Sequence, residues 1–108
     1  FTATGQADRV QLTWQTVSEV GLYGFHLYRG LEPAGPGERI TGEPVPAQAM
    51  GGLQGFDYGY EDLLMPADGV VYYWLEELHS DGPAILHGPE FVTSAQLLPR
   101  LYLPLISQ

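Results

Sequence analysis

Lysine, asparagine and cysteine are absent from this chain of 108 residues, and its only Lys or Arg side chains are four arginines. Thirteen acidic residues oppose them, which gives a formal net charge of −9. Nucleic-acid binding needs clustered Lys and Arg to neutralise phosphates, so this composition argues against a nucleic-acid partner. It argues equally against an anionic membrane surface. Without cysteine, the chain can form neither a disulfide nor a thiolate metal site.

Long apolar runs are also missing. The most apolar stretch, residues 97–106, is about half the length of a bilayer span and is interrupted by Pro99, Arg100 and Pro104, so we expect no membrane span. The length allows one domain. The first residue is Phe1 rather than Met, from which we expect a processed N-terminus and an extracellular or cell-surface location.

What the chain has is apolar residues alternating with polar ones at a period of two, the pattern of half-buried strands. In residues 10–16, Val10, Leu12 and Trp14 share one face. Segments rich in Gly, Pro and Asp separate such runs, and helices longer than a turn or two are not expected. Strands are predicted at residues 1–4, 10–16, 25–29, 56–61, 70–78 and 90–95. About seven short strands at this spacing predict an all-β sandwich over residues 1–95.

Three motifs carry a family resemblance: Trp14-Gln15-Thr16 followed by Ser18-Glu19, the run Gly24–Arg29 (GFHLYR), and the run Val71–Glu76 (VYYWLE). In this order they resemble fibronectin type III domains, and more narrowly a subgroup common in secreted and surface proteins of bacteria. The resemblance implies an immunoglobulin-like sandwich with Trp14 in its core. It also implies that Tyr72 forms the tyrosine corner, with its hydroxyl bonded to nearby backbone.

The alternation in residues 70–78 supports the same assignment, because it places Val70, Tyr72, Trp74 and Leu78 on one face. We therefore expect Tyr72 and Trp74 to join Trp14 and Phe25 in the core.

The histidines and aspartates are the candidate metal ligands of the chain. His79 and His87 flank one predicted hairpin and, with Asp81, could hold zinc. The favoured interpretation is that they are ordinary hairpin residues, because no CxxC or HExxH spacing accompanies them. Calcium is a further hypothesis, but no Asp-x-Asp-x-Asp pattern is present and surface solubility explains the acids as well. Its candidate ligands are Asp57, Asp62, Asp68 and Asp81. We expect no cofactor.

Catalysis has weak candidates. The acids Glu76-Glu77 and Glu61-Asp62 invite a comparison with glycosidases, which use two carboxylates. Adjacent residues of a strand point to opposite faces, however, so Glu76 and Glu77 cannot act together. No serine lies in a nucleophile elbow. We expect a protein that is not an enzyme.

Tyrosines offer a binding hypothesis. Tyr58 and Tyr60 share a strand face, and exposed rings there, with Tyr73, could stack on sugars. That would make the chain a carbohydrate- or protein-binding accessory module of a larger secreted enzyme or adhesin. The favoured interpretation is aromatic pairing that stabilises the sheet.

Residues 96–108, QLLPRLYLPLISQ, are apolar on both faces of an extended chain. Leaving their large side chains in water would forgo burial on the order of 10 kcal/mol. Three hypotheses remain open: the segment caps its own sandwich, inserts into a neighbouring subunit, or serves as an attachment tag. Pro99 and Pro104 exclude a fully bonded central strand and favour an edge strand or groove insertion. The expected inter-subunit contacts are Leu98, Leu101, Tyr102, Leu103, Leu105 and Ile106.

These observations lead to one functional expectation. The chain is expected to be a non-enzymatic extracellular structural protein, a surface filament subunit that associates into a homopolymer through residues 96–108. Contact with a surface glycan or the cell wall is a further expectation.

Overall fold

The computed structural model describes residues 1–6, 8–49, 52–63 and 69–93. These residues form eight β-strands and no helix, so the all-β prediction is confirmed. None of their elements is a helix long and apolar enough to cross a membrane. The strands are β1 (Thr2–Gly5), β2 (Val10–Gln15), β3 (Leu22–Gly30), β4 (Glu38–Arg39), β5 (Val45–Pro46), β6 (Asp57–Asp62), β7 (Val70–His79) and β8 (Ile85–Thr93).

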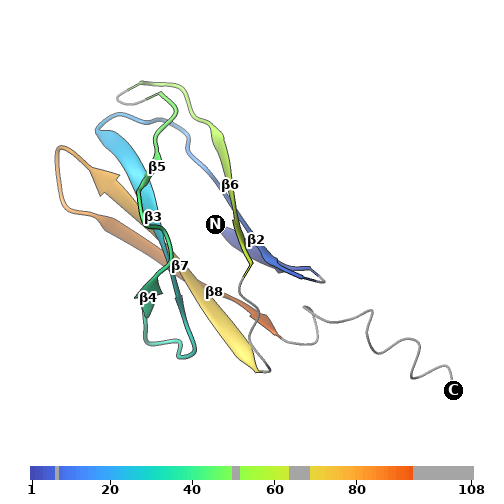
Figure 1. Cartoon of the computed structure of the whole chain (residues 1–108). Coiled ribbons are helices and arrows are strands. Elements are labelled where there is room, and N and C mark those ends of the chain that lie inside the picture. The colour runs from blue at the N-terminus through green and yellow to red at the C-terminus, as the bar shows by residue number, and fades with distance from the viewer. Residues whose placement is uncertain (7, 50–51, 64–68, 94–108) are drawn as a thin grey trace, which may run out of the picture.

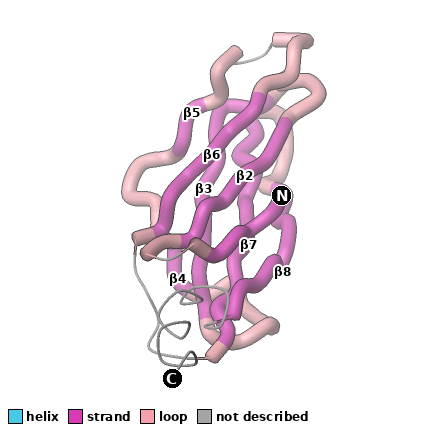
Figure 2. The backbone as a smooth tube through the Cα atoms, turned by 90° about the vertical axis from the view of Figure 1, so that its right-hand side faces the viewer, coloured by secondary structure: helices cyan, strands magenta, loops and turns pink. Residues whose placement is uncertain are grey.

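Two antiparallel sheets face each other in a sandwich-like arrangement (Figures 1 and 2). One sheet has the order β1-β2-β6. The other has the order β4-β3-β7-β8, and β5 pairs with β3 as well. The strands β1 and β8 lie beside each other along one edge of the sandwich (Figure 2). Each alternating strand has one apolar face, and a second sheet is needed to cover it. The alternating pattern therefore predicts the sandwich.

Aromatic rings from both sheets fill the core. The Trp14 ring from β2 stacks on the Tyr58 ring from β6, with centroids 5.5 Å apart and planes 4° from parallel. Phe25 from β3 meets both edge-on, at 5.4 Å from Trp14 and 4.9 Å from Tyr58. Such pairs stabilise beyond the area that they bury, by about 1 kcal/mol each. The structure thus places Trp14 and Phe25 in the core, where the sequence located them.

Residues on β7 face the opposite way from the expectation. Val71, Tyr73 and Leu75 are the core residues of this strand, and Tyr73 is fully buried. Tyr72 and Trp74 lie on the outer face, where Tyr72 is 6.3 Å from the Phe91 ring and 6.4 Å from Trp74. The predicted face was wrong because both sets of alternate residues are apolar or aromatic, so the period does not distinguish them.

Trp74 is nevertheless 3 % exposed, because the loop after β3 covers it from outside. A Cβ atom added at Gly35 in that loop would lie 2.1 Å from the Trp74 ring. Only a residue without a side chain allows the loop to approach so closely.

An ion pair ties the sheets together at one end. The Arg29 guanidinium on β3 donates to both carboxylate oxygens of Asp62 on β6, at 2.8 Å each. The Tyr73 hydroxyl on β7 donates to the same carboxylate at 2.7 Å. Burial, together with this bond, raises the pKa of Tyr73 well above its ordinary value. The hydroxyl that anchors β7 is therefore that of Tyr73, not of Tyr72, and its acceptor is a side chain rather than backbone.

Candidate functional site

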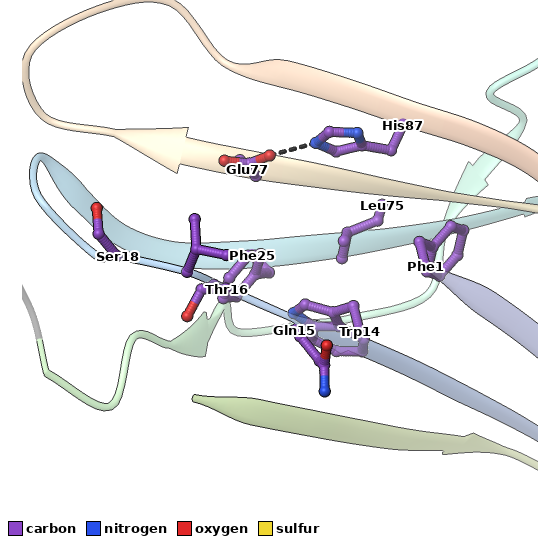
Figure 3. Close-up of a pocket in the computed structure, with 10 residues that line it drawn as sticks. Phe1, Trp14, Gln15, Thr16, Ser18, Phe25, Leu75, Glu77 and His87 are labelled. Carbon is purple, nitrogen blue, oxygen red and sulfur yellow. Dashed lines mark hydrogen bonds and ion pairs between the residues drawn. The ribbon is translucent and has the colours of Figure 1, made fainter. Parts of the chain in front are cut away.

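A hollow of about 230 Å³ opens between the two sheets, beyond the end of β1 (Figure 3). Its apolar wall is formed by Trp14 from β2, Phe25 from β3 and Leu75 from β7, together with Phe1, which directly precedes β1. Its rim carries Glu77 and His87, with the loop 15–18 opposite. A cavity of about 150 Å³ accommodates benzene, so this one has room for one or two aliphatic side chains.

A second hollow, of about 520 Å³, shares Phe1, Trp14 and Gln15 with the first. It adds the polar side chains of Thr2, Thr13 and Asp57. Both hollows therefore meet at the end of β2.

The pairing of β2 explains why both hollows lie at its end. Its ladder with β1 ends at the pair Thr2–Thr13, whereas its ladder with β6 continues to the pair Gln15–Asp57. The last two residues of β2 thus have a sheet neighbour, within the described part of the chain, only on the β6 side. An extended segment could add at this edge.

Trp14 supplies a buried hydrogen-bond donor at the same place. Its side chain is 4 % exposed, and its indole Nε1 has no hydrogen-bond partner among the described residues. A buried donor left without an acceptor costs about 1–3 kcal/mol. A ligand with an acceptor that reaches this atom would recover that cost.

Glu77 is held at the rim by two histidines. The Nε2 atom of His79 is 3.1 Å from one carboxylate oxygen, and the Nε2 atom of His87 is hydrogen-bonded to the other (Figure 3 shows the second contact). Asp81 lies farther off, 3.9 Å from His79. The two histidines thus converge, as the zinc hypothesis required, but on Glu77. No group of three or more His, Cys, Asp or Glu in the described segments is arranged to hold a metal ion.

The remaining described acids proposed from the sequence lie apart from one another, and each has a hydrogen-bond or ion-pair partner. Asp57 accepts a hydrogen bond from Gln15, Glu61 pairs with Arg9, and Asp62 is bound by Arg29. They do not form a shared calcium or catalytic site. Asp68 lies outside the described residues.

Glu76 and Glu77 follow the expectation for adjacent strand residues. Glu76 accepts a bond from Tyr28 on the outer face of the sheet, whereas Glu77 lines the hollow between the sheets.

The tyrosines proposed for ligand stacking are placed otherwise. Tyr58 is 8 % exposed and Tyr73 is fully buried, so neither offers a free ring face. Tyr60 is partly buried, packs against the core, and bonds to the Ile40 carbonyl at 3.4 Å. Residues 58, 60 and 73 all point toward the opposite sheet, so they lack the exposure that the sugar-stacking hypothesis requires.

A buried carboxylate escaped the sequence analysis. Glu19 is fully buried and accepts hydrogen bonds from the Tyr58 hydroxyl at 2.5 Å, from the Thr16 hydroxyl at 2.8 Å and from the Ala49 amide at 2.8 Å. Burial opposes its charge, but these bonds outweigh burial and hold the pKa of Glu19 below its ordinary value. The same burial and bond raise the pKa of Tyr58 to about 12. Thr16 and Glu19 are therefore structural.

Comparison with protein-family models, curated proteins and solved structures finds no match to this chain. The six residues proposed for inter-subunit contact all fall in residues 96–108 and so lie outside the described residues.

Proposed function

We propose that this protein is a non-enzymatic extracellular structural subunit that joins copies of itself through residues 96–108. The observation that carries the proposal is the apolar hollow between Trp14 and Leu75. Its apolar wall suits an extended apolar segment, and the sequence of residues 96–108 offers one. A donor segment and an acceptor on the same subunit allow head-to-tail joining, which produces filaments when the contact does not close into a ring.

A finer assignment of the fold belongs to the same proposal. We assign the sandwich to the fibronectin type III kind, in a form typical of secreted and surface proteins of bacteria. The support is the strand order β1-β2-β6 against β4-β3-β7-β8, with a core Trp14 on the second strand. The extracellular location rests on the same resemblance.

The placement of the acids supports a role without chemistry. Catalysis by paired carboxylates needs two groups facing one substrate. Glu76 and Glu77 occupy opposite faces of β7, and Glu61 is paired with Arg9 at the surface. The buried tyrosines give no support to sugar stacking, and we do not propose it as a second function.

The test is light scattering of the full chain at neutral pH over a range of concentrations. The wild type is expected to form assemblies of many subunits. The variant Leu101→Asp/Leu103→Asp, which puts two charges in the proposed donor, is expected to be monomeric. Leu31→Asp is the matched control, because Leu31 is exposed in the loop after β3 and should leave assembly unchanged. A wild type that stays monomeric at every concentration overturns the proposal.

A further inference from the structure

The hollow and residues 96–108 match in shape and polarity. The hollow has apolar walls and an open side, with Trp14 and Leu75 on opposite sheets. In an extended chain, Leu101 and Leu103 project from the same face and lie about 7 Å apart. That spacing would let both side chains enter the hollow from the edge of β2.

The polar groups match as well. The indole N–H of Trp14 is a buried donor without an acceptor among the described residues. Every residue of an extended segment, proline included, carries a backbone carbonyl that can accept. Pro99 and Pro104 therefore leave this contact intact, although they remove two N–H donors.

Charge complements the fit. All thirteen acids lie before residue 94, whereas the only charged side chain in residues 96–108 is Arg100. Glu77 stands at the rim of the hollow. In an extended chain Arg100 projects from the face opposite to Leu101, so its positive charge stays outside the apolar hollow and is attracted by the net negative charge of the acceptor copy.

The position of β1 favours the segment of a second copy over the chain's own segment. β8 ends at Thr93, which pairs with Val70, whereas the hollow lies toward the other end of β7, near Glu77. The chain's own segment would have to turn back along the edge of the sandwich. β1 already lies beside β8 along that edge and stands in the way of such a return (Figure 2). A segment that arrives from a second copy does not have to pass β1.

We propose that the hollow receives residues 101–103 of a second copy, with Leu101 and Leu103 against Trp14 and Leu75 and a backbone carbonyl on the Trp14 indole. This inference rests on the proposed function and names the partner surface that it needs.

The test uses the full-length Leu101→Asp/Leu103→Asp variant, whose own donor is disabled, and a synthetic peptide of residues 96–108. Binding is followed through the two indole ¹H–¹⁵N resonances. That of Trp14 is expected to shift on saturation. That of Trp74, covered by the loop after β3, is the internal control and should stay in place.

A matched pair of receptor variants locates the contact. Val17 is 96 % exposed and lines the hollow, whereas Val20, in the same loop, is 52 % exposed and does not line it. Val17→Asp is expected to weaken peptide binding at least 10-fold, and Val20→Asp less than 2-fold. A peptide with Asp at both 101 and 103 should not bind.

The inference and the function fail separately. If the wild type assembles but the peptide leaves the Trp14 indole unmoved, or if both valine variants bind alike, the hollow is not the acceptor; self-assembly then stands on the light scattering alone and uses another surface. If the peptide shifts Trp14 but the wild type is monomeric throughout, the assembly function is overturned, and the second copy with it.

Discussion

Replacing Glu19 with glutamine should remove one of the strongest polar supports of the fold. The carboxylate receives three donors: Oε2 accepts from Tyr58 and Thr16, and Oε1 accepts from the Ala49 amide. Glutamine has one acceptor oxygen. If that oxygen takes the place of Oε2, its NH₂ group faces the amide of Ala49, donor against donor.

The cost can be worked from these contacts. An unsatisfied buried amide costs about 1–3 kcal/mol. The two remaining bonds lose the charge that strengthens them, about 1 kcal/mol each. We expect Glu19→Gln to lower the free energy of unfolding by about 3–5 kcal/mol, a large fraction of the roughly 5–15 kcal/mol typical of a domain.

The assay is equilibrium unfolding in urea, followed by tryptophan fluorescence, since Trp14 stacks on Tyr58. Glu61→Gln is the control: Glu61 is about half exposed in its ion pair with Arg9 and should cost less than about 1 kcal/mol. Tyr58→Phe, a milder change, keeps the test decisive if Glu19→Gln does not fold; it should cost about 1–3 kcal/mol. Equal losses for Glu19→Gln and Glu61→Gln would refute the reasoning.

Three further outcomes are expected. The pKa of Tyr58 is about 12 in the folded protein and about 10 in the unfolded chain, so its contribution to stability, about 3 kcal/mol, is present below pH 10 and is lost as the pH rises to 12. Urea unfolding at pH 9 and pH 11 should show this loss of stability, and the loss should be smaller in Tyr58→Phe. Burial, aided by the positive charge of Arg39, lowers the pKa of His26, so the unfolded chain takes up a proton first as the pH falls through about 6.5; stability should drop between pH 7.5 and 5.5, and His26→Gln should drop less. Gly35→Ala should cost about 1–3 kcal/mol by thermal unfolding because its Cβ would meet Trp74 at 2.1 Å, whereas Gly42→Ala, with nothing within 4 Å, should cost nothing; equal effects would show that the loop yields freely.

Most of the strands could be predicted from the sequence, because each has one face covered by the other sheet, and that burial appears in the sequence as an apolar residue at every second position. Residues 10–16 were expected as a strand and Val10–Gln15 form β2; residues 56–61 were expected and Asp57–Asp62 form β6. β4 and β5 were not predicted, since two-residue strands carry no period.

The site was less predictable because it depends on contacts between distant segments. Glu19 lies 39 residues from Tyr58, and nothing local to either shows that they meet. Likewise the convergence of two histidines on Glu77 follows from the β7–β8 register, in which Leu75 pairs with His87. The hollow itself is set by where the β1 ladder ends, a limit that no residue pattern marks.

The pairing of β8 has a mechanical consequence. It runs from Ile85 opposite Glu77 to Thr93 opposite Val70, and residues 94–108 follow directly. A pull applied through those residues acts along the axis of β8, so the ladder bonds are loaded together in shear and cannot open one after another. Each such bond contributes only about 1 kcal/mol, yet breaking many at once needs far more force than peeling them apart. If copies join as proposed, tension would enter at the hollow near Glu77 and leave through the end of β8 at Thr93, so it would load the β7–β8 ladder along its length.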